Sequence, residues 1–374
     1  MTAVDPPWDV LVVGAGPAGA AAARSAALSG ARVLLVEREQ LPRYKRCGGG
    51  LIGPSREALA AAGLDVAALS RDTVGRITFT SRGRQRFTRT APAFLPMVLR
   101  SELDAALVDA AVAAGAQLRT GVTVTSYAQD GDTVTVGTRS GPLSARAVVA
   151  ADGSGGRAAA HVGVVYDQVD LGMEAELPTP PGSDWAGHVL LDWGPVPGSY
   201  GWVFPKGDTL TVGVIGDRAE GEGVRAYYRD FVASLGLDLA TALHDGGHLT
   251  RVRAPGSPLQ RGAVLVAGDA AGLLEPWTRE GISFALRSGR LAGAAAAGEV
   301  SSYAPAGERE LGADVAAGRR ALAAFTRHPG AVHGVMWAVP PMWELFVRLV
   351  SGRTTMARQL ERAPVRALVS ALGG

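Results

Sequence analysis

The chain has 374 residues, 47% hydrophobic and 19% charged, so it can bury a sizeable core in one large domain or two interleaved ones. Its 37 basic and 35 acidic residues nearly cancel, and no run of like charges marks a nucleic-acid groove, which argues against nucleic acid as a partner. The single cysteine, Cys47, excludes an internal disulfide. The first nine residues lack the basic start and apolar core of a signal peptide, so we expect a cytoplasmic protein.

The first readable unit is a β-α-β motif. An apolar run over residues 8–13 leads into a glycine-rich turn, an alanine-rich helix up to Ser29 and a second apolar run over residues 33–36. The turn residues expected to contact a cofactor are Gly14, Gly16, Pro17, Ala18 and Gly19. The glycines allow a tight turn and let backbone amides approach a pyrophosphate. Glu37, at the end of the second run, would accept hydrogen bonds from ribose hydroxyls, and Arg38 follows it. This context predicts a dinucleotide-binding fold.

The segment up to residue 151 alternates helical and extended patterns. We expect helices over residues 55–62 and 100–114, the second starting with the capping-box-like spacing of Ser101 and Asp104. Alternating residues near 77–86 suggest short strands. Further strands are expected at residues 122–126, 133–137 and 143–151, with a hairpin signal at Asp130-Gly131-Asp132.

The second half of the chain changes character twice. Aromatic and Gly/Pro-rich strand segments dominate from residue 171 to about 253, a buried strand follows at residues 263–267, and helical patterns run from Gly281 to the end. We therefore expect an α/β protein, α+β overall, with a Rossmann-like domain over residues 1–165 and 255–300. A β-rich substrate domain over residues 166–254 would be inserted into it, and residues 301–374 would form a helical C-terminal region.

A Rossmann-like N-terminal unit binds either FAD or NAD, so the choice of cofactor must be inferred from later segments. Arg100 opens a helix, Ala151-Asp152-Gly153 ends a strand and precedes Arg157, and Ala267-Gly268-Asp269-Ala270 ends another strand. In this order they resemble the fingerprints of the flavoproteins that include aromatic hydroxylases, halogenases and geranylgeranyl reductases. The resemblance implies FAD, with Asp269 on the ribityl chain, Arg100 near the ribityl phosphate and Val124 by the adenine. For Asp152 and Gly153 a cofactor role and a solvated turn with Arg157 are both open.

The segment Thr278-Arg279-Glu280-Gly281-Ile282 leads into an apolar helix. The amides of Gly281 and Ile282 at this helix start would stabilise negative charge on the N1-C2=O edge of a reduced flavin. The alternative is a plain helix start without a ligand.

Two more motifs narrow the group. The segment Lys45-Arg46-Cys47-Gly48-Gly49-Gly50 after Pro42 resembles the P-x-x-x-K-x-C-G-G segment of geranylgeranyl reductases, which lies by the flavin. The segment Tyr200-Gly201-Trp202-Val203-Phe204-Pro205-Lys206, leading to Val212-Gly213, resembles their Y-x-W-x-F-P-K…V-G segment. With Glu280-Gly281-Ile282…Ala285…Ser288-Gly289 the resemblance extends from about residue 8 to 295. It implies an FAD-dependent reductase that hydrogenates C=C bonds of a prenyl chain. Arg279 departs from the family, since many members have glycine there.

Several residues are candidates for the chemistry. Tyr200, Trp202 and Phe204 alternate onto one face of a strand and, with Pro205, would bind a long apolar substrate, although such rings also fill cores. Hydride would leave the reduced flavin while a proton reaches the other alkene carbon. The Cys47 thiol is one candidate to supply or relay that proton, and packing against the flavin is the alternative. Tyr200 and Trp202 complete the catalytic candidates, and we expect no metal site.

The remaining expectations concern partners and rival functions. No second G-x-G-x-x-G follows, so NAD(P)H would bind transiently or a separate protein would donate electrons. The apolar stretch 331–343 is too short to span a bilayer, and it forms either a packed helix pair or a peripheral contact with the inner face of the membrane. The rival enzymatic reading is a flavin monooxygenase or halogenase acting on an aromatic substrate, since the halogenase segment W-x-W-x-I-P is matched in part. A non-catalytic flavin or prenyl-lipid binding protein is a third reading.

Overall fold

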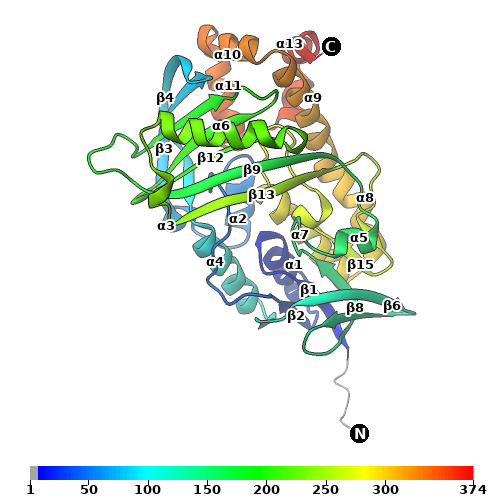
Figure 1. The fold of residues 1–374 in the computed structure, drawn as a ribbon. Coiled ribbons are helices and arrows are strands. Elements are labelled where there is room, and N and C mark those ends of the chain that lie inside the picture. The colour runs from blue at the N-terminus through cyan, green and yellow to red at the C-terminus, as the bar shows by residue number, and fades with distance from the viewer. Residues whose placement is uncertain (1–6, 374) are drawn as a thin grey trace.

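Two β-sheets organise the chain, and the computed structural model describes residues 7–373 of it (Figure 1). The first sheet has the order β14-β15-β8-β1-β2-β5, with β7 paired to β8 and β6 to β7. The pairs among β15, β8, β1, β2 and β5 are parallel, as expected for a Rossmann-like domain. Its strands are β1 (Trp8–Val13), β2 (Val33–Val36), β5 (Gln117–Arg119), β6 (Val124–Asp130), β7 (Thr133–Thr138), β8 (Leu143–Ala150), β14 (Gln260–Arg261) and β15 (Val264–Val266).

Small residues bring two helices together on this sheet. Helix α1 (Pro17–Leu28) packs against α7 (Ile282–Ala297), and a Cβ at Gly289 or Gly293 would lie 2.1 Å from the carbonyl oxygen of Ala18 or Ala22. Only glycine permits this approach, which explains the Gly/Ala composition of both helices. Helix α4 (Arg100–Ala113) packs beside α1. The close packing fixes the start of α1 relative to the start of α7.

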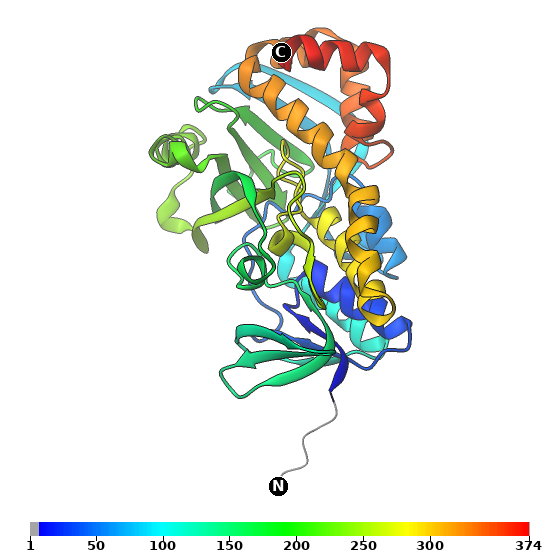
Figure 2. The ribbon, with the colours of Figure 1, turned by 90° about the vertical axis from the view of Figure 1, so that its right-hand side faces the viewer.

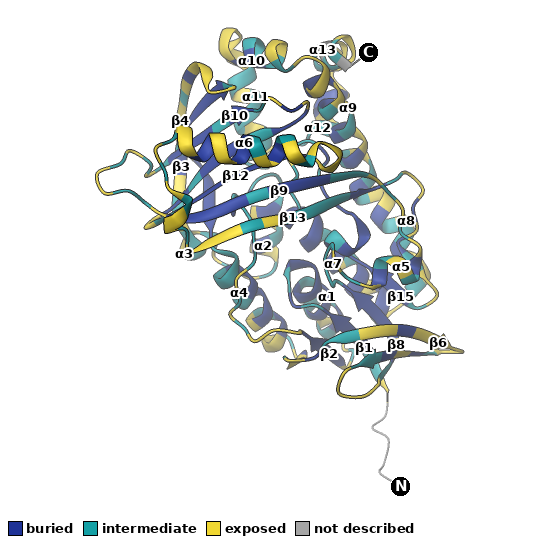
Figure 3. Cartoon of the chain, viewed as in Figure 1, coloured by how far each residue is buried: buried dark blue, intermediate teal, exposed yellow. Residues whose placement is uncertain are grey.

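The second sheet has the order β13-β9-β12-β11-β10-β3-β4 and is antiparallel except for the pair β10 and β3. Helix α6 (Gly221–Ser234) covers one face, with Tyr227, Tyr228 and Phe231 buried, and Figure 3 shows its other side exposed. Its strands are β3 (Ser70–Ser81), β4 (Arg84–Val98), β9 (Tyr166–Pro178), β10 (His188–Trp193), β11 (Tyr200–Lys206), β12 (Thr209–Asp217) and β13 (His244–Arg253).

The C-terminal region is helical and packs on the second sheet. Figure 2 shows these helices, orange to red, at the end of the molecule far from the N-terminus. Trp343 and Phe346 pack their rings against Phe79, with centroid distances of 6.5 and 5.5 Å. Within the stretch 331–343, Val332, Met336, Met342 and Trp343 pack against the second sheet, whereas Trp337 and Val339 are exposed. The main helices are α8 (Tyr303–Gly307), α9 (Ala313–Arg327), α10 (Pro329–Ala338), α11 (Pro340–Val350), α12 (Met356–Leu360) and α13 (Ala363–Gly373), and the other short helices are α2 (Ser55–Ala61), α3 (Val66–Leu69) and α5 (Ala158–Val162).

Two differences from the sequence expectations are informative. Residues 70–98 form two long strands of the second sheet, so a boundary at residue 165 does not separate the two sheets. The capping box at Ser101 and Asp104 was wrong, because α4 has Leu99 at its N-cap without a side-chain cap and Asp104 binds Arg100 instead. Residues 1–6, on which the signal-peptide expectation partly rests, lie outside the described residues. Within residues 7–373 no helix has the length and apolar character needed to cross a bilayer.

Candidate flavin site

The glycine-rich turn between β1 and α1 forms one side of the candidate site. Gly14 has a φ of 95°, and a Cβ there would lie 2.3 Å from the carbonyl oxygen of Ala151. A Cβ at Gly19 would lie 1.7 Å from the carbonyl oxygen of Gly14. These glycines are therefore required by contact between strand, turn and helix. Gly16 is the N-cap of α1, and Pro17 and Ala18 follow it as buried first residues of the helix.

Two arginine side chains converge on Gly16. A Cβ at this glycine would lie 3.7 Å from Nη2 of Arg43 and 3.9 Å from Nη2 of Arg100. The fully buried carboxylate of Asp104 holds both, accepting from Arg100 Nε and Nη2 at 2.8 and 2.9 Å and from Arg43 Nη1 at 3.1 Å. Fixed guanidinium groups beside a helix N-terminus are the donors that a pyrophosphate requires. Arg100 was expected here, whereas Arg43 was not.

Glu37 ties the glycine turn to the end of β2. Its Oε2 accepts from the Ala15 amide at 2.8 Å, and its Oε1 accepts from the amides of Arg38 and Glu39 at 2.9 and 3.2 Å. An ionised carboxylate offers about four acceptor sites, so these three bonds leave capacity for a ribose hydroxyl. The Arg38 side chain is largely exposed and pairs with Glu39. The Val122 amide donates to the Glu37 carbonyl at 2.9 Å, so the chain leading to Val124 starts beside this end of β2.

Asp152, at the end of β8, organises the turn that Gly153 opens. Its Oδ2 accepts from the amides of Arg157 and Ala158 at 2.8 and 3.1 Å, at the start of α5. Burial raises the pKa of Asp152, and these backbone bonds oppose that rise. The interaction with Arg157 is therefore through the backbone amide, which does not match the solvated side-chain pair considered from the sequence.

The Asp269 turn and the start of α7 meet beside the start of α1, where a Cβ at Gly268 would lie 2.9 Å from the Ala18 side chain. Asp269 lies in a short helical turn after β15, and a Cβ at Gly281 would lie 3.4 Å from its Oδ1. Gly281 is the N-cap of α7 and Ile282 is its first residue. Glu280 is buried beside them and accepts from the Ser283 amide at 2.6 Å. Burial raises the pKa of Glu280 to about 7, although the bonds from Ser283 oppose the rise.

The Cys47 segment (Lys45 to Gly50) crosses the face of the second sheet opposite helix α6, which we call the inner face. A Cβ at Gly48 would lie 2.8 Å from the Phe204 ring, and Gly49 has a φ of 79° with its Cα close to the Lys206 side chain. Lys206 Nζ donates to the Cys47 carbonyl oxygen at 3.1 Å, and the Gly49 amide lies 3.4 Å from the Cys47 sulfur. Gly50 forms an isolated bridge to Met97 of β4. Backbone approach therefore explains the glycines after Cys47.

The aromatic residues of β11 form a row on this inner face, which we call the aromatic wall (Tyr200, Trp202 and Phe204). Neighbouring ring centroids lie 5.9 and 6.2 Å apart. Pro205 and Gly201 are four residues apart in β11, so they lie on the same face of the sheet. Gly201 packs against Tyr227 and Phe231 of α6. Pro205 therefore belongs to the other face of the sheet, because successive strand residues alternate. Its expected place beside the substrate does not fit this register.

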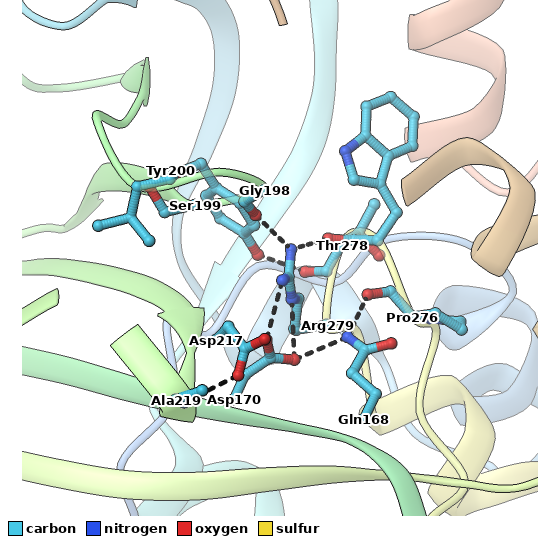
Figure 4. A network of polar contacts seen from close by, with 12 residues as sticks. Gln168, Asp170, Gly198, Ser199, Tyr200, Asp217, Ala219, Pro276, Thr278 and Arg279 are labelled. Carbon is cyan, nitrogen blue, oxygen red and sulfur yellow. Dashed lines mark hydrogen bonds and ion pairs between the residues drawn. The ribbon is translucent and has the colours of Figure 1, made fainter. Parts of the chain in front are cut away.

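A buried ion pair joins the loop before α7 to the second sheet, as Figure 4 shows. Arg279 Nε and Nη2 donate to Asp170 of β9 at 3.2 and 3.0 Å, and the two side chains are 4% and 3% exposed. Arg279 Nη1 also donates to the carbonyl of Gly198 at 3.1 Å. The hydroxyl of Tyr200 donates to the carbonyl of Thr278. Arg279 has a φ of 55°, the left-handed region that favours glycine, so this residue keeps a strained backbone.

These features together fit FAD better than a smaller nucleotide. The helix N-terminus, the two arginines and Glu37 supply donors and an acceptor for a pyrophosphate and a ribose, and Asp269 and the α7 amides lie next to this helix start. The Cys47 segment and the aromatic wall adjoin one another on the second sheet. The described residues contain no cluster of three or more metal-ligating His, Cys, Asp or Glu side chains.

Comparisons with known proteins agree with this geometry. A family profile described as "FAD binding domain" matches residues 7–189. A digeranylgeranylglycerophospholipid reductase of Methanosphaera stadtmanae is 30% identical over 313 residues, which are 77% of this chain and 77% of the relative. A menaquinone reductase of Mycolicibacterium smegmatis is 30% identical over 319 residues, which are 76% and 75% of the two chains.

Solved structures share the fold at lower identity. A geranylgeranyl bacteriochlorophyll reductase-like protein from Thermoplasma acidophilum has a TM-score of 0.74 at 19% identity, covering 98% of this chain and 99% of that one. A flavin-dependent brominase has a TM-score of 0.73 at 19% identity with the same coverage. These likenesses show the fold, which reductases and halogenases share.

Proposed function

The chain belongs to the geranylgeranyl reductase family of FAD-dependent oxidoreductases, and we propose that it hydrogenates C=C bonds of a geranylgeranyl or related prenyl chain on a lipid, a quinone or a prenylated natural product. The observation that carries the proposal is the aromatic wall, which lies directly against the glycines that follow Cys47. A row of rings gives a long apolar chain a surface on which to bury itself.

The chain's own residues would hold the cofactor and order the substrate. FAD, when bound, supplies the hydride. Arg43, Arg100 and the start of α1 would bind the pyrophosphate, and Asp269 would bind the ribityl chain. The amides of Gly281 and Ile282 would stabilise negative charge on the reduced ring system.

The proton needs a separate source on the protein. The Tyr200 hydroxyl already donates to the Thr278 carbonyl, so its hydrogen is engaged. Cys47 remains the candidate at the wall, and we propose that its thiol gives the proton to the alkene carbon that does not receive the hydride.

Electron supply and membrane contact complete the proposal. NAD(P)H in transient contact, or a donor protein, would reduce the flavin. Trp337 and Val339 are 61% and 39% exposed at the end of α10, and we propose this edge as the part that meets a membrane surface. Trp337→Ser should lower sedimentation with anionic vesicles, and unchanged sedimentation would exclude this edge.

The direct test is anaerobic incubation of chemically reduced, FAD-loaded protein with a geranylgeranyl compound, followed by mass measurement. The expected product gains two hydrogens for each double bond reduced. A requirement for oxygen, with oxygen or halogen in the product, would instead establish a monooxygenase or halogenase. Binding without a change in mass would identify a carrier.

A further inference from the structure

The inner face of the second sheet carries a buried acid beside the aromatic wall. Glu174 of β9 is 1% exposed, and both of its carboxylate oxygens lack a hydrogen-bond partner among the described residues. The indole Nε1 of Trp202 and the hydroxyl of Thr211, on the same face, are also buried without such a partner. Unpartnered buried polar atoms are rare in folded proteins, so this group marks a place where a ligand, water or proton is handled.

The strand register places Glu174 next to the wall. Trp202 pairs with Gly213, Gly213 with Glu174, and Glu174 with Gly246, which makes one row across β11, β12, β9 and β13. A Cβ at Gly213 would lie 2.3 Å from the Trp202 indole, and a Cβ at Gly246 would lie 2.6 Å from the Arg46 guanidinium. The two glycines thus let the indole and the guanidinium lie over the sheet on either side of the Glu174 carboxyl.

The Cys47 segment covers this row. The Glu174 carboxyl lies near the backbone amide of Cys47, without normal hydrogen-bond geometry, while Lys206 Nζ holds the Cys47 carbonyl at 3.1 Å. The Cys47 backbone is therefore flanked by a buried acid and a buried amine, the Arg100 guanidinium lies beside the Cys47 thiol, and Trp202 lies beside the following glycine.

The positive groups around Glu174 offset only part of the effect of burial on its pKa. Burial raises the pKa of Glu174 to about 7, opposed by Lys206, the Cys47 amide, Arg46 and Lys45. Further titratable groups near this row are Glu176 of β9, Tyr44 beside the Cys47 segment, His244 and His248 of β13, and Tyr228 of α6. Burial lowers the pKa of His248 to about 4, so this ring is neutral at pH 7.

We propose that Glu174 is the internal acid that reloads Cys47 with a proton during alkene reduction, a proposal that rests on the proposed function. In each turnover the alkene π bond breaks, the hydride forms one C–H bond, and the thiol proton forms the other. The resulting thiolate takes the proton of the Glu174 carboxyl, and the carboxylate regains a proton from water. Hydride and proton together reduce the alkene, and the protein returns to its starting state.

The test compares Glu174→Gln with the matched control Glu176→Gln, the next acid on the same face of β9. Glu174→Gln should retain FAD and accept electrons from dithionite, yet reduce the alkene about 10²-fold more slowly, the range for a lost acid. Glu176→Gln should reduce it normally. Glu174→Asp, which restores an acid, should recover part of the rate. A normal rate in Glu174→Gln would overturn the proposal, whereas an inactive wild type would instead refute the proposed function.

A second measurement tests the coupling of Glu174 and Cys47 without alkene reduction. Cys47 is the single cysteine, so iodoacetamide labelling of the FAD-loaded protein reports one thiol. The pH profile of labelling should change in Glu174→Gln relative to wild type and stay unchanged in Glu176→Gln. Identical profiles in all three proteins would show that Glu174 and Cys47 are not coupled, and would overturn the proposal even if the rate falls.

Discussion

Asp170→Ala should destabilise the protein strongly, because it leaves the Arg279 guanidinium buried without its counter-charge. Two charge-assisted hydrogen bonds at 3.2 and 3.0 Å are lost, in a pair whose side chains are 4% and 3% exposed. Removing one partner of such a buried pair costs about 3–5 kcal/mol. Arg279→Gly should cost less: it leaves the Asp170 carboxylate without its cation, but Gln168 still donates to that carboxylate at 2.7 Å and the substitution relieves a left-handed backbone worth about 1–2 kcal/mol.

The assay is urea unfolding of the four proteins of a double-mutant cycle, each loaded with FAD. The double variant should lose less free energy of unfolding than the two single losses added, with an interaction energy of about 2–3 kcal/mol. FAD affinity should fall in both single variants, because Gly281 follows Arg279 in the same loop. A loss below about 1 kcal/mol for Asp170→Ala, or strict additivity in the cycle, would refute the reasoning about this pair.

Three other predictions test the site. Glu37→Ala should weaken FAD binding by about 1.5–3 kcal/mol in a titration of apoprotein, since a charge-assisted bond to ribose is lost, and unchanged affinity would remove Glu37 from the cofactor site. Cys47→Ser and Cys47→Ala should both keep FAD and lower alkene reduction about 10²-fold, while normal rates in both would reduce Cys47 to a packing role. Alkene reduction should decline as the pH rises through about 7, because the acid form of Glu174 is the one that gives the proton, and this limb should vanish in Glu174→Gln; a limb that survives the substitution belongs to another group.

Local patterns carried much of the fold. The β-α-β unit, the helix from Arg100 and the hairpin at Asp130-Gly131-Asp132 were predicted close to their observed bounds, since each depends on neighbours in the chain. The strands of residues 70–98 were underestimated, because β3 joins the second sheet by pairing with β10, more than 100 residues later, and β4 joins it by pairing with β3. The sequence shows alternation there, but it does not show which sheet will receive the strand.

Long-range partners also explain which site residues were missed. Arg43 has no motif of its own, and its role follows from Asp104, 61 residues later, which fixes its guanidinium beside Gly16. Pro205 was assigned to the substrate from its motif, although strand parity alone would have placed it opposite Trp202 and Phe204.

Glu174 shows why a buried acid beside an apolar wall is hard to find from sequence. In its strand it looks like an ordinary polar residue in an alternating pattern, which usually faces solvent. Only the pairing with Gly213 and Gly246 reveals that neighbouring side chains close over it from both sides. If Trp202 and Arg46 did not lie over these glycines, the carboxyl would be open to water and its pKa would be that of an ordinary glutamate. The chemistry proposed for Cys47 therefore depends on two residues that lie in other strands and carry no functional group of their own.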